Sequence, residues 1–135
     1  MAVGNLIKEG SEDAVQAEVV RWARDNEVRF PELVLLHSIP NAGFASKKQG
    51  ALRKLTGRVA GMPDLHLPIR RGEWYGLWIE LKRTPYRDAR GKLQKAKVSA
   101  DQKRVMGLLR EQSHRVEVCE GAQPAIELLE SYLTS

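Results

Sequence analysis

Two apolar segments separated by a short charged turn constrain the fold more than any other part of the chain. Residues 64–69 and 74–82 each have the length of a strand, and the two arginines and the glycine of residues 70–72 suit a turn between them. We therefore expect an antiparallel hairpin. Within its second strand Glu80 and Lys82 are two residues apart, so they share one face while the apolar residues beside them pack on the other.

Periodic apolar positions predict helices on either side of this hairpin. Helical spacing, with a capping serine at the start of the first and third, predicts helices over residues 11–26, 47–55, 99–112 and 124–133. Short apolar runs predict further strands over residues 33–39 and 114–119, and residues 41–46 are expected to form a loop. Residues 83–97 hold a proline, a glycine and few apolar side chains, which favours a mobile loop. This order of elements predicts an α/β sandwich with a central mixed sheet.

The length of the chain suits a single domain over residues 1–135. Cys119 is the only cysteine, so we interpret it as a buried structural thiol in a reducing compartment. The sequence has no run of about 18 apolar residues, and its first residues lack the apolar core of a secretion signal. We therefore expect a cytoplasmic protein, bacterial or in a phage-infected host cell, with no membrane partner.

The net charge is +5 and the sequence pI is about 9.6, and the basic excess is concentrated in two segments. Residues 83–97 carry six basic residues and one acid, and residues 41–63 carry five basic residues and no acid. These segments flank the charged residues of the hairpin, as expected of a protein that holds a polyanion across a catalytic centre. The alternative for each segment is an ordinary solvated surface. The side chains expected to bind DNA are Lys47, Lys48, Arg53, Lys54, Arg58, Arg83, Arg87, Arg90 and Lys92.

A Pro63-Asp64 pair is followed, after fifteen intervening residues, by Glu80-Leu81-Lys82. Across the hairpin Asp64 can lie close to Glu80, which gives two hard oxygen ligands of the kind that Mg²⁺ or Mn²⁺ prefers. An ion held there would activate water and neutralise charge during phosphodiester hydrolysis, with Lys82 beside the phosphate. The alternative is a surface pair of Glu80 and Lys82, with Asp64 capping a turn.

Two further side chains are candidates for the same site. Glu12 falls near the middle of the apolar arc of the first helix and is the candidate third metal ligand, with Glu18 in reserve. Its alternative role is that of a first-turn acid matched to the helix dipole. Gln102, in the first turn of the third helix, can hydrogen-bond the lysine or a phosphate, and its alternative is a solvated amide.

The aromatic and histidine side chains favour packing over chemistry. Trp74, Tyr75 and Trp78 lie on a predicted strand, where such residues more often pack in the core than stack on bases. The three histidines show no metal-ligand spacing. His66 shares a strand face with Asp64, and packing is its favoured role.

Five strings accompany Glu12 and Gln16 of the first helix: HSIPNAG from His37, GMPDL from Gly61, GLWIELK from Gly76, VSADQ from Val98 and VCEGAQPAIELLESYL from Val118. Taken together, they resemble a stand-alone VRR-NUC domain, a branch of the PD-(D/E)xK nuclease superfamily found in phages and bacteria. The resemblance implies a restriction-endonuclease-like fold, a divalent metal, homodimers and cutting of structured DNA such as Holliday junctions. By position, it implies catalytic roles for Asp64, Glu80 and Lys82. It also implies metal assistance from Glu12 and an active-site role for Gln102.

We therefore expect a metal-dependent, structure-selective DNA endonuclease. One alternative is a restriction-type enzyme that recognises a sequence, although the chain shows no obvious element for reading bases. The other is a catalytically inactive DNA-binding module of the same fold. The presence of Asp64, Glu80 and Lys82 together favours chemistry.

Overall fold

The computed structural model describes residues 6–40 and 47–135 of the chain. Within these residues a four-stranded mixed sheet has the order β1 (His37–Ser38), β2 (Leu65–Leu67), β3 (Leu77–Lys82) and β6 (Arg115–Glu120). Strand β2 is antiparallel to β1 and β3, whereas β3 and β6 are parallel. The predicted hairpin and the predicted mixed sheet are both confirmed.

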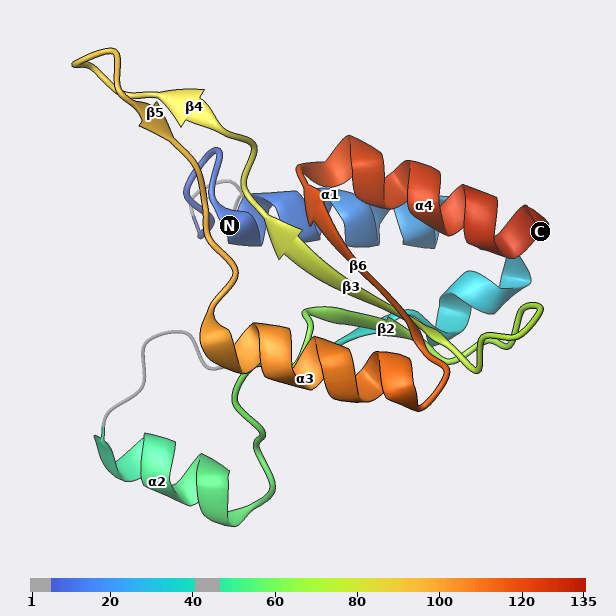
Figure 1. Ribbon diagram of the computed structural model, residues 1–135. Helices are drawn as coiled ribbons and strands as arrows, with labels where there is room; N and C mark the ends of the chain where they lie inside the picture. Colours follow the sequence, from blue (N-terminus) through green and yellow to red (C-terminus); the bar gives the residue numbers. More distant parts are fainter. Residues whose placement is uncertain (1–5, 41–46) are drawn as a thin grey trace.

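Helices cover both faces of this sheet (Figure 1). α1 (Glu12–Asp25) and α4 (Ala122–Thr134) lie side by side over one face, and α3 (Ala100–Glu111) lies along the other. The main hydrophobic core lies between the sheet and the helices α1 and α4. A smaller cluster around Trp78 and Met106 lies between the sheet and α3. None of the described helices combines the length and apolarity needed to cross a membrane.

Strand β3 is buried on both faces, which makes it the centre of the molecule. Leu77, Ile79 and Leu81 pack into the main core beneath α1 and α4. The alternate side chains face α3, and two of them, Glu80 and Lys82, are charged although only 2% and 6% exposed. Burying ionised groups is costly unless they find partners, so this strand requires a polar site around its last residues.

The predicted serine caps are present and set where α1 and α3 begin. The Ser11 hydroxyl accepts from the Ala14 amide at 3.1 Å, and the Ser99 hydroxyl accepts from the Gln102 amide at 3.2 Å. In return, the Gln102 side chain accepts from the Ser99 amide at 2.9 Å, which completes a capping box. These caps fix the first turns that carry Glu12 and Gln102.

The strand expected over residues 33–39 is mostly wrong. Pro31–Leu35 forms a 3-10 helix, η2, and only His37–Ser38 pairs in the sheet. The buried side chains Leu33 and Leu36 are three residues apart, which matches a 3-10 turn, whereas the two residues between them are exposed. The apolar run of residues 33–39 therefore has the spacing of a 3-10 turn, which the strand prediction overlooked. The loop expected over residues 41–46 lies outside the described residues.

The loop expected over residues 83–97 instead contains a small hairpin, β4 (Tyr86–Arg87) with β5 (Leu93–Gln94). The Asp88 carboxylate closes its turn by accepting from the Arg90 and Lys92 amides and from the Gln94 side chain, each at 2.9 Å. These hydrogen bonds lower the pKa of Asp88, the one from Lys92 most strongly. We call residues 83–97 the basic arm, and Figure 1 shows it projecting beyond the sheet.

The remaining predicted elements are present with small shifts at their ends. The helix α2 (Lys47–Leu55) forms as predicted, but it buries no residue and lies apart from the rest of the ribbon in Figure 1. The strands expected over residues 64–69 and 74–82 are both shorter, so Trp74 and Tyr75 precede β3 instead of lying on it, and the last helix begins before Pro124. Cys119 is buried as expected, and burial raises the pKa of its thiol to about 11.

Candidate active site

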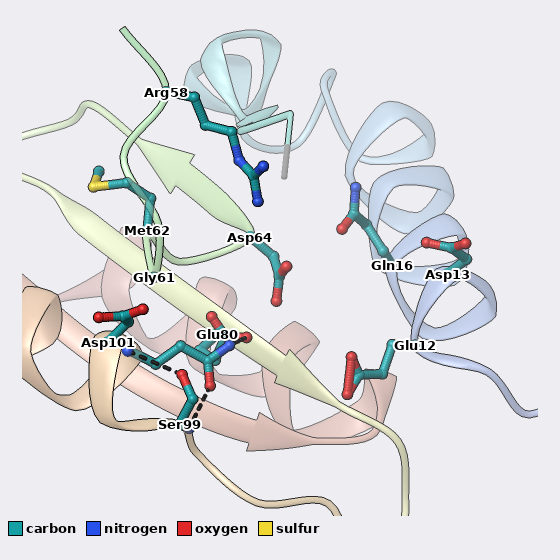
Figure 2. Close-up of a pocket in the computed structure, with 11 residues that line it drawn as sticks. Glu12, Asp13, Gln16, Arg58, Gly61, Met62, Asp64, Glu80, Ser99 and Asp101 are labelled. Carbon is teal, nitrogen blue, oxygen red and sulfur yellow. Dashed lines mark hydrogen bonds between the residues drawn. The ribbon is translucent and has the colours of Figure 1, made fainter. Parts of the chain in front are cut away.

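A pocket of about 330 Å³ opens where the first turns of α1 and α3 meet β3 and the loop before β2. Its lining is polar and mainly acidic (Figure 2). The lining carboxylates are Glu12, Asp13, Asp64, Glu80 and Asp101. The amides of Gln16 and Gln102 also line it, as does the Arg58 side chain. This concentration of carboxylates favours the binding of a cation.

Asp64 and Glu80 converge in this pocket, as the hairpin geometry predicted. The Asp64 Oδ2 atom accepts a hydrogen bond from the Leu81 amide at 2.7 Å, which holds its carboxylate against β3. Burial raises the pKa of Glu80 to about 8, and the neighbouring charge of Asp64 and a hydrogen bond with it add to this effect. The carboxyl group of Glu80 therefore keeps its proton to a higher pH than an ordinary glutamate does.

Gln102 connects the two charged side chains of β3. Its Nε2 atom donates to Glu80 Oε1 at 3.0 Å, and its Oε1 atom accepts from Lys82 Nζ at 3.2 Å. The hydrogen bond expected between Gln102 and the lysine is thus present. The Ser99 amide donates to the same Oε1 atom, so the capping box fixes which way the amide faces.

The first helix contributes Glu12 rather than Glu18. Glu12 Oε1 lies 3.9 Å from Lys82 Nζ, and its side chain is 49% exposed at the rim of the pocket. Glu80 Oε1 lies 3.7 Å from the same nitrogen. The Lys82 ammonium is therefore surrounded by two carboxylates and an amide. Glu18 is exposed and lies outside the pocket lining.

Asp64 and Glu80 have the chemistry to hold a divalent cation. Among the described residues, Glu80 Oε2 is buried and accepts no hydrogen bond from any group other than Asp64, and its carboxyl group is crowded by Asp64. A cation would satisfy that oxygen and offset the repulsion between the two acids. Among the described residues, no three His, Cys, Asp or Glu side chains are arranged to hold a metal ion together. Mg²⁺ is commonly bound through one or two carboxylates together with water and substrate phosphates.

The residues predicted to bind DNA separate into three places. Arg58 reaches the pocket. Lys47, Lys48, Arg53 and Lys54 are exposed on α2, and Arg87, Arg90 and Lys92 are exposed on the basic arm. Arg83, at the base of this arm, is half-buried with its guanidinium 3.9 Å from the centre of the Tyr86 ring. Figure 1 shows the arm and α2 projecting from the end of the molecule where α1 and α3 begin, so they flank the pocket.

The three histidines, His37, His66 and His114, lie outside the pocket lining, and their rings pack near one another. The His66 ring stacks on Trp78 at 3.8 Å between centroids, and Trp78 Nε1 donates to His114 Nδ1 at 3.3 Å. Burial, followed by the nearby charges of His37 and His114, lowers the pKa of His66 to about 4. His66 is not among the pocket residues, which favours the packing role.

Gly61 has a structural role that its place in the GMPDL string did not indicate. It has a φ of +89°, and a Cβ atom there would lie 2.5 Å from the backbone of Asp101. The loop that carries Asp64 therefore packs directly against the first turn of α3. The glycine two residues before Pro63 is a signal that could have indicated such a close approach.

Comparisons with known proteins place this geometry in a family. The sequence model of the VRR-NUC domain matches residues 4–123. A solved structure described as a VRR_NUC domain protein is 26% identical, covers 95% of this chain and 92% of its own, and superposes with a TM-score of 0.73. None of the curated proteins compared is significantly similar.

Proposed function

The chain belongs to the VRR-NUC domain family and has its restriction-endonuclease-like fold, and we propose that it is a divalent-metal-dependent endonuclease that cuts branched DNA. The family is of nuclease type, as the sequence resemblance predicted. The observation that carries the proposal is the convergence of Asp64 and Glu80 in one acidic pocket, with Lys82 beside them.

In this proposal Asp64 and Glu80 hold Mg²⁺ or Mn²⁺, with Glu12 at the rim as the third candidate ligand. Such an ion, when bound, neutralises charge on the phosphate and activates water. Gln102 fixes Glu80 and Lys82 relative to each other through its two hydrogen bonds. The lysine has three N–H donors and gives one to Gln102, so it can also donate to a phosphate oxygen and stabilise the charge that develops there.

Binding of DNA is assigned to the basic surfaces on either side of the pocket. The exposed lysines and arginines of α2 and the basic arm contact phosphates, which gives affinity without reading a sequence. In this proposal the protein recognises the shape of branched DNA. The distance between α2 and the basic arm, and the arrangement of two subunits in a homodimer, determine which shape fits. Size measurement in solution by light scattering tests the dimer.

The decisive experiment incubates the purified protein with labelled four-way junction, fork and linear duplex, each with Mg²⁺, Mn²⁺ or EDTA. We expect metal-dependent cleavage that is fastest on a branched substrate. Cleavage that persists in EDTA would refute the metal mechanism. Preferential cutting at one sequence of the duplex would favour a restriction-type enzyme, and binding without cutting would favour an inactive DNA-binding module.

Metal binding is expected to release a proton and to strengthen as the pH rises towards 8. Because the pKa of Glu80 is raised to about 8, an incoming cation must displace the proton of that carboxyl below this pH. The logarithm of the association constant should therefore rise by up to about one per pH unit and level off above the pKa. Calorimetric titration with Mn²⁺, in buffers of different ionisation enthalpy, measures both the association constant and the number of protons released. Glu80→Gln is the control that releases no proton, and an affinity that is constant between pH 6 and 8 contradicts the assignment.

Neutralising the basic arm is expected to weaken DNA binding and to flatten its dependence on salt. In the triple variant R87Q/R90Q/K92Q, the slope of log K against log salt should fall by about 0.9 for each phosphate that the arm no longer neutralises. Fluorescence anisotropy with a junction at several salt concentrations measures this slope. Arg21→Gln, which removes one charge from an exposed position on α1, is the control. An unchanged slope in the triple variant would place the DNA elsewhere.

A further inference from the structure

Arg58 stands apart from the other residues of its basic segment. It follows α2 and precedes the loop that carries Asp64, and Figure 2 shows its side chain directed into the pocket. The residue is half-buried, whereas the four basic residues of α2 are exposed. Its position therefore calls for an explanation other than general attraction to DNA.

In the part of the chain that the structure describes, the guanidinium of Arg58 has no partner, although carboxylates line the same pocket. Among the described residues its Nε atom is buried without a hydrogen-bond acceptor, and none of the ion pairs includes it. Lys82 differs, because Gln102, Glu80 and Glu12 surround its ammonium. Within the described residues, Arg58 is thus the cation at this site whose side chain makes neither a hydrogen bond nor an ion pair.

A buried donor without an acceptor costs free energy unless a ligand completes it. Arg58 is the one basic residue in the described pocket lining, so an anionic ligand would make its charge-assisted contacts there. A guanidinium presents paired N–H donors that match two oxygens of one phosphate group. Arg58, Asp64 and Glu80 line the same pocket, and in the view of Figure 2 Asp64 lies between the other two, so a phosphate held at Arg58 would share the pocket with the two acids.

We propose that Arg58 is a catalytic residue that binds the non-bridging oxygens of the scissile phosphate. This inference rests on the proposed function and deepens it. In the hydrolysis a water oxygen bonds to phosphorus while one phosphorus–oxygen ester bond breaks, the water loses a proton and the departing oxygen gains one. Arg58 stabilises the negative charge that accumulates on the non-bridging oxygens, and it remains protonated throughout.

The first test measures single-turnover cleavage of a four-way junction at saturating enzyme and Mg²⁺. Arg58→Met is expected to lower the cleavage rate constant by about a hundredfold, because it removes one preorganised donor at the developing charge. Its dissociation constant for DNA should change by less than about threefold, since most affinity comes from the exposed basic surfaces. Arg58→Lys keeps the positive charge but not the paired N–H donors, so its cleavage rate constant should fall by about tenfold. The matched control is Arg21→Met, a surface arginine of α1 outside the pocket.

The second test uses thymidine 3′,5′-bisphosphate with Ca²⁺, and calorimetry measures its binding without any cleavage. Arg58→Met should bind this probe at least about tenfold more weakly than the wild type, and Arg21→Met should bind it equally well. Equal binding by the wild type and Arg58→Met, or a cleavage rate constant within threefold of the wild type, overturns the inference. If the wild type cuts no DNA, the proposed function fails and bisphosphate binding alone decides the role of Arg58. Arg58→Lys provides the same comparison if Arg58→Met does not fold.

Discussion

Replacing Asp64 with asparagine is expected to lower the rate constant of DNA cleavage by about a thousandfold, the factor that corresponds to losing roughly 4 kcal/mol of transition-state stabilisation. Asparagine keeps the shape of the side chain, and its carbonyl oxygen can still accept the hydrogen bond from the Leu81 amide. What it removes is one of the two negative charges that would hold the cation. The fold should therefore persist while the chemistry is lost.

Single-turnover cleavage and Mn²⁺ titration of Asp64→Asn measure both parts of this prediction. Glu18→Gln removes an exposed carboxylate of α1 that lies outside the pocket, and its cleavage rate should match that of the wild type. DNA affinity should be unchanged in both variants because the basic arm and α2 are intact. If Asp64→Asn cuts at the normal rate, Asp64 is not a metal ligand.

The centre of the site was predictable because local rules determine it. Side chains two residues apart on a strand share a face, which placed Glu80 beside Lys82, and the short turn fixed the antiparallel pairing that brings Asp64 close. Serine caps likewise set the starts of α1 and α3. These signals depend on a few neighbouring residues, so the rest of the chain does not override them.

The features that sequence reasoning missed depend on contacts between distant residues. The Arg24 side chain donates to the Leu33 and Leu36 carbonyls at 2.8 and 2.6 Å, and these bonds help to hold the 3-10 turn in a run that suggested a strand. Similarly, no local pattern distinguishes Arg58 from the basic residues of α2. Only the path of the loop after that helix turns its side chain into the pocket.

Gln102 shows how one residue can serve the fold and the site together. As the third residue of α3 it closes the capping box with Ser99, a role that stabilises the start of the helix. The same amide bridges Glu80 and Lys82 on β3. Because helix capping fixes the amide, the two charged side chains meet a partner whose orientation is set before substrate binds, which is the preorganisation that electrostatic catalysis requires.

Gly61→Ala is expected to destabilise the protein and to misplace Asp64. The φ of Gly61 is +89°, which is strained for alanine, and the added Cβ would lie 2.5 Å from the carbonyl carbon and oxygen of Asp101. Strain and overpacking together should cost about 3 kcal/mol, or roughly 10 °C in the unfolding midpoint. The loop must move away from α3, so cleavage should also fall by about a hundredfold at temperatures where the variant is folded.

Gly72→Ala is the matched control, because Gly72 also has a positive φ, +55°, but no atom lies within 4 Å of its added Cβ. It lies in the turn between β2 and β3, away from the pocket, so only the conformational cost of about 1 kcal/mol applies and cleavage should be unaffected. Thermal unfolding and single-turnover cleavage of both variants separate backbone strain from close approach. If the two variants lose equal stability, the contact between the Gly61 loop and α3 is not what positions Asp64 beside Glu80.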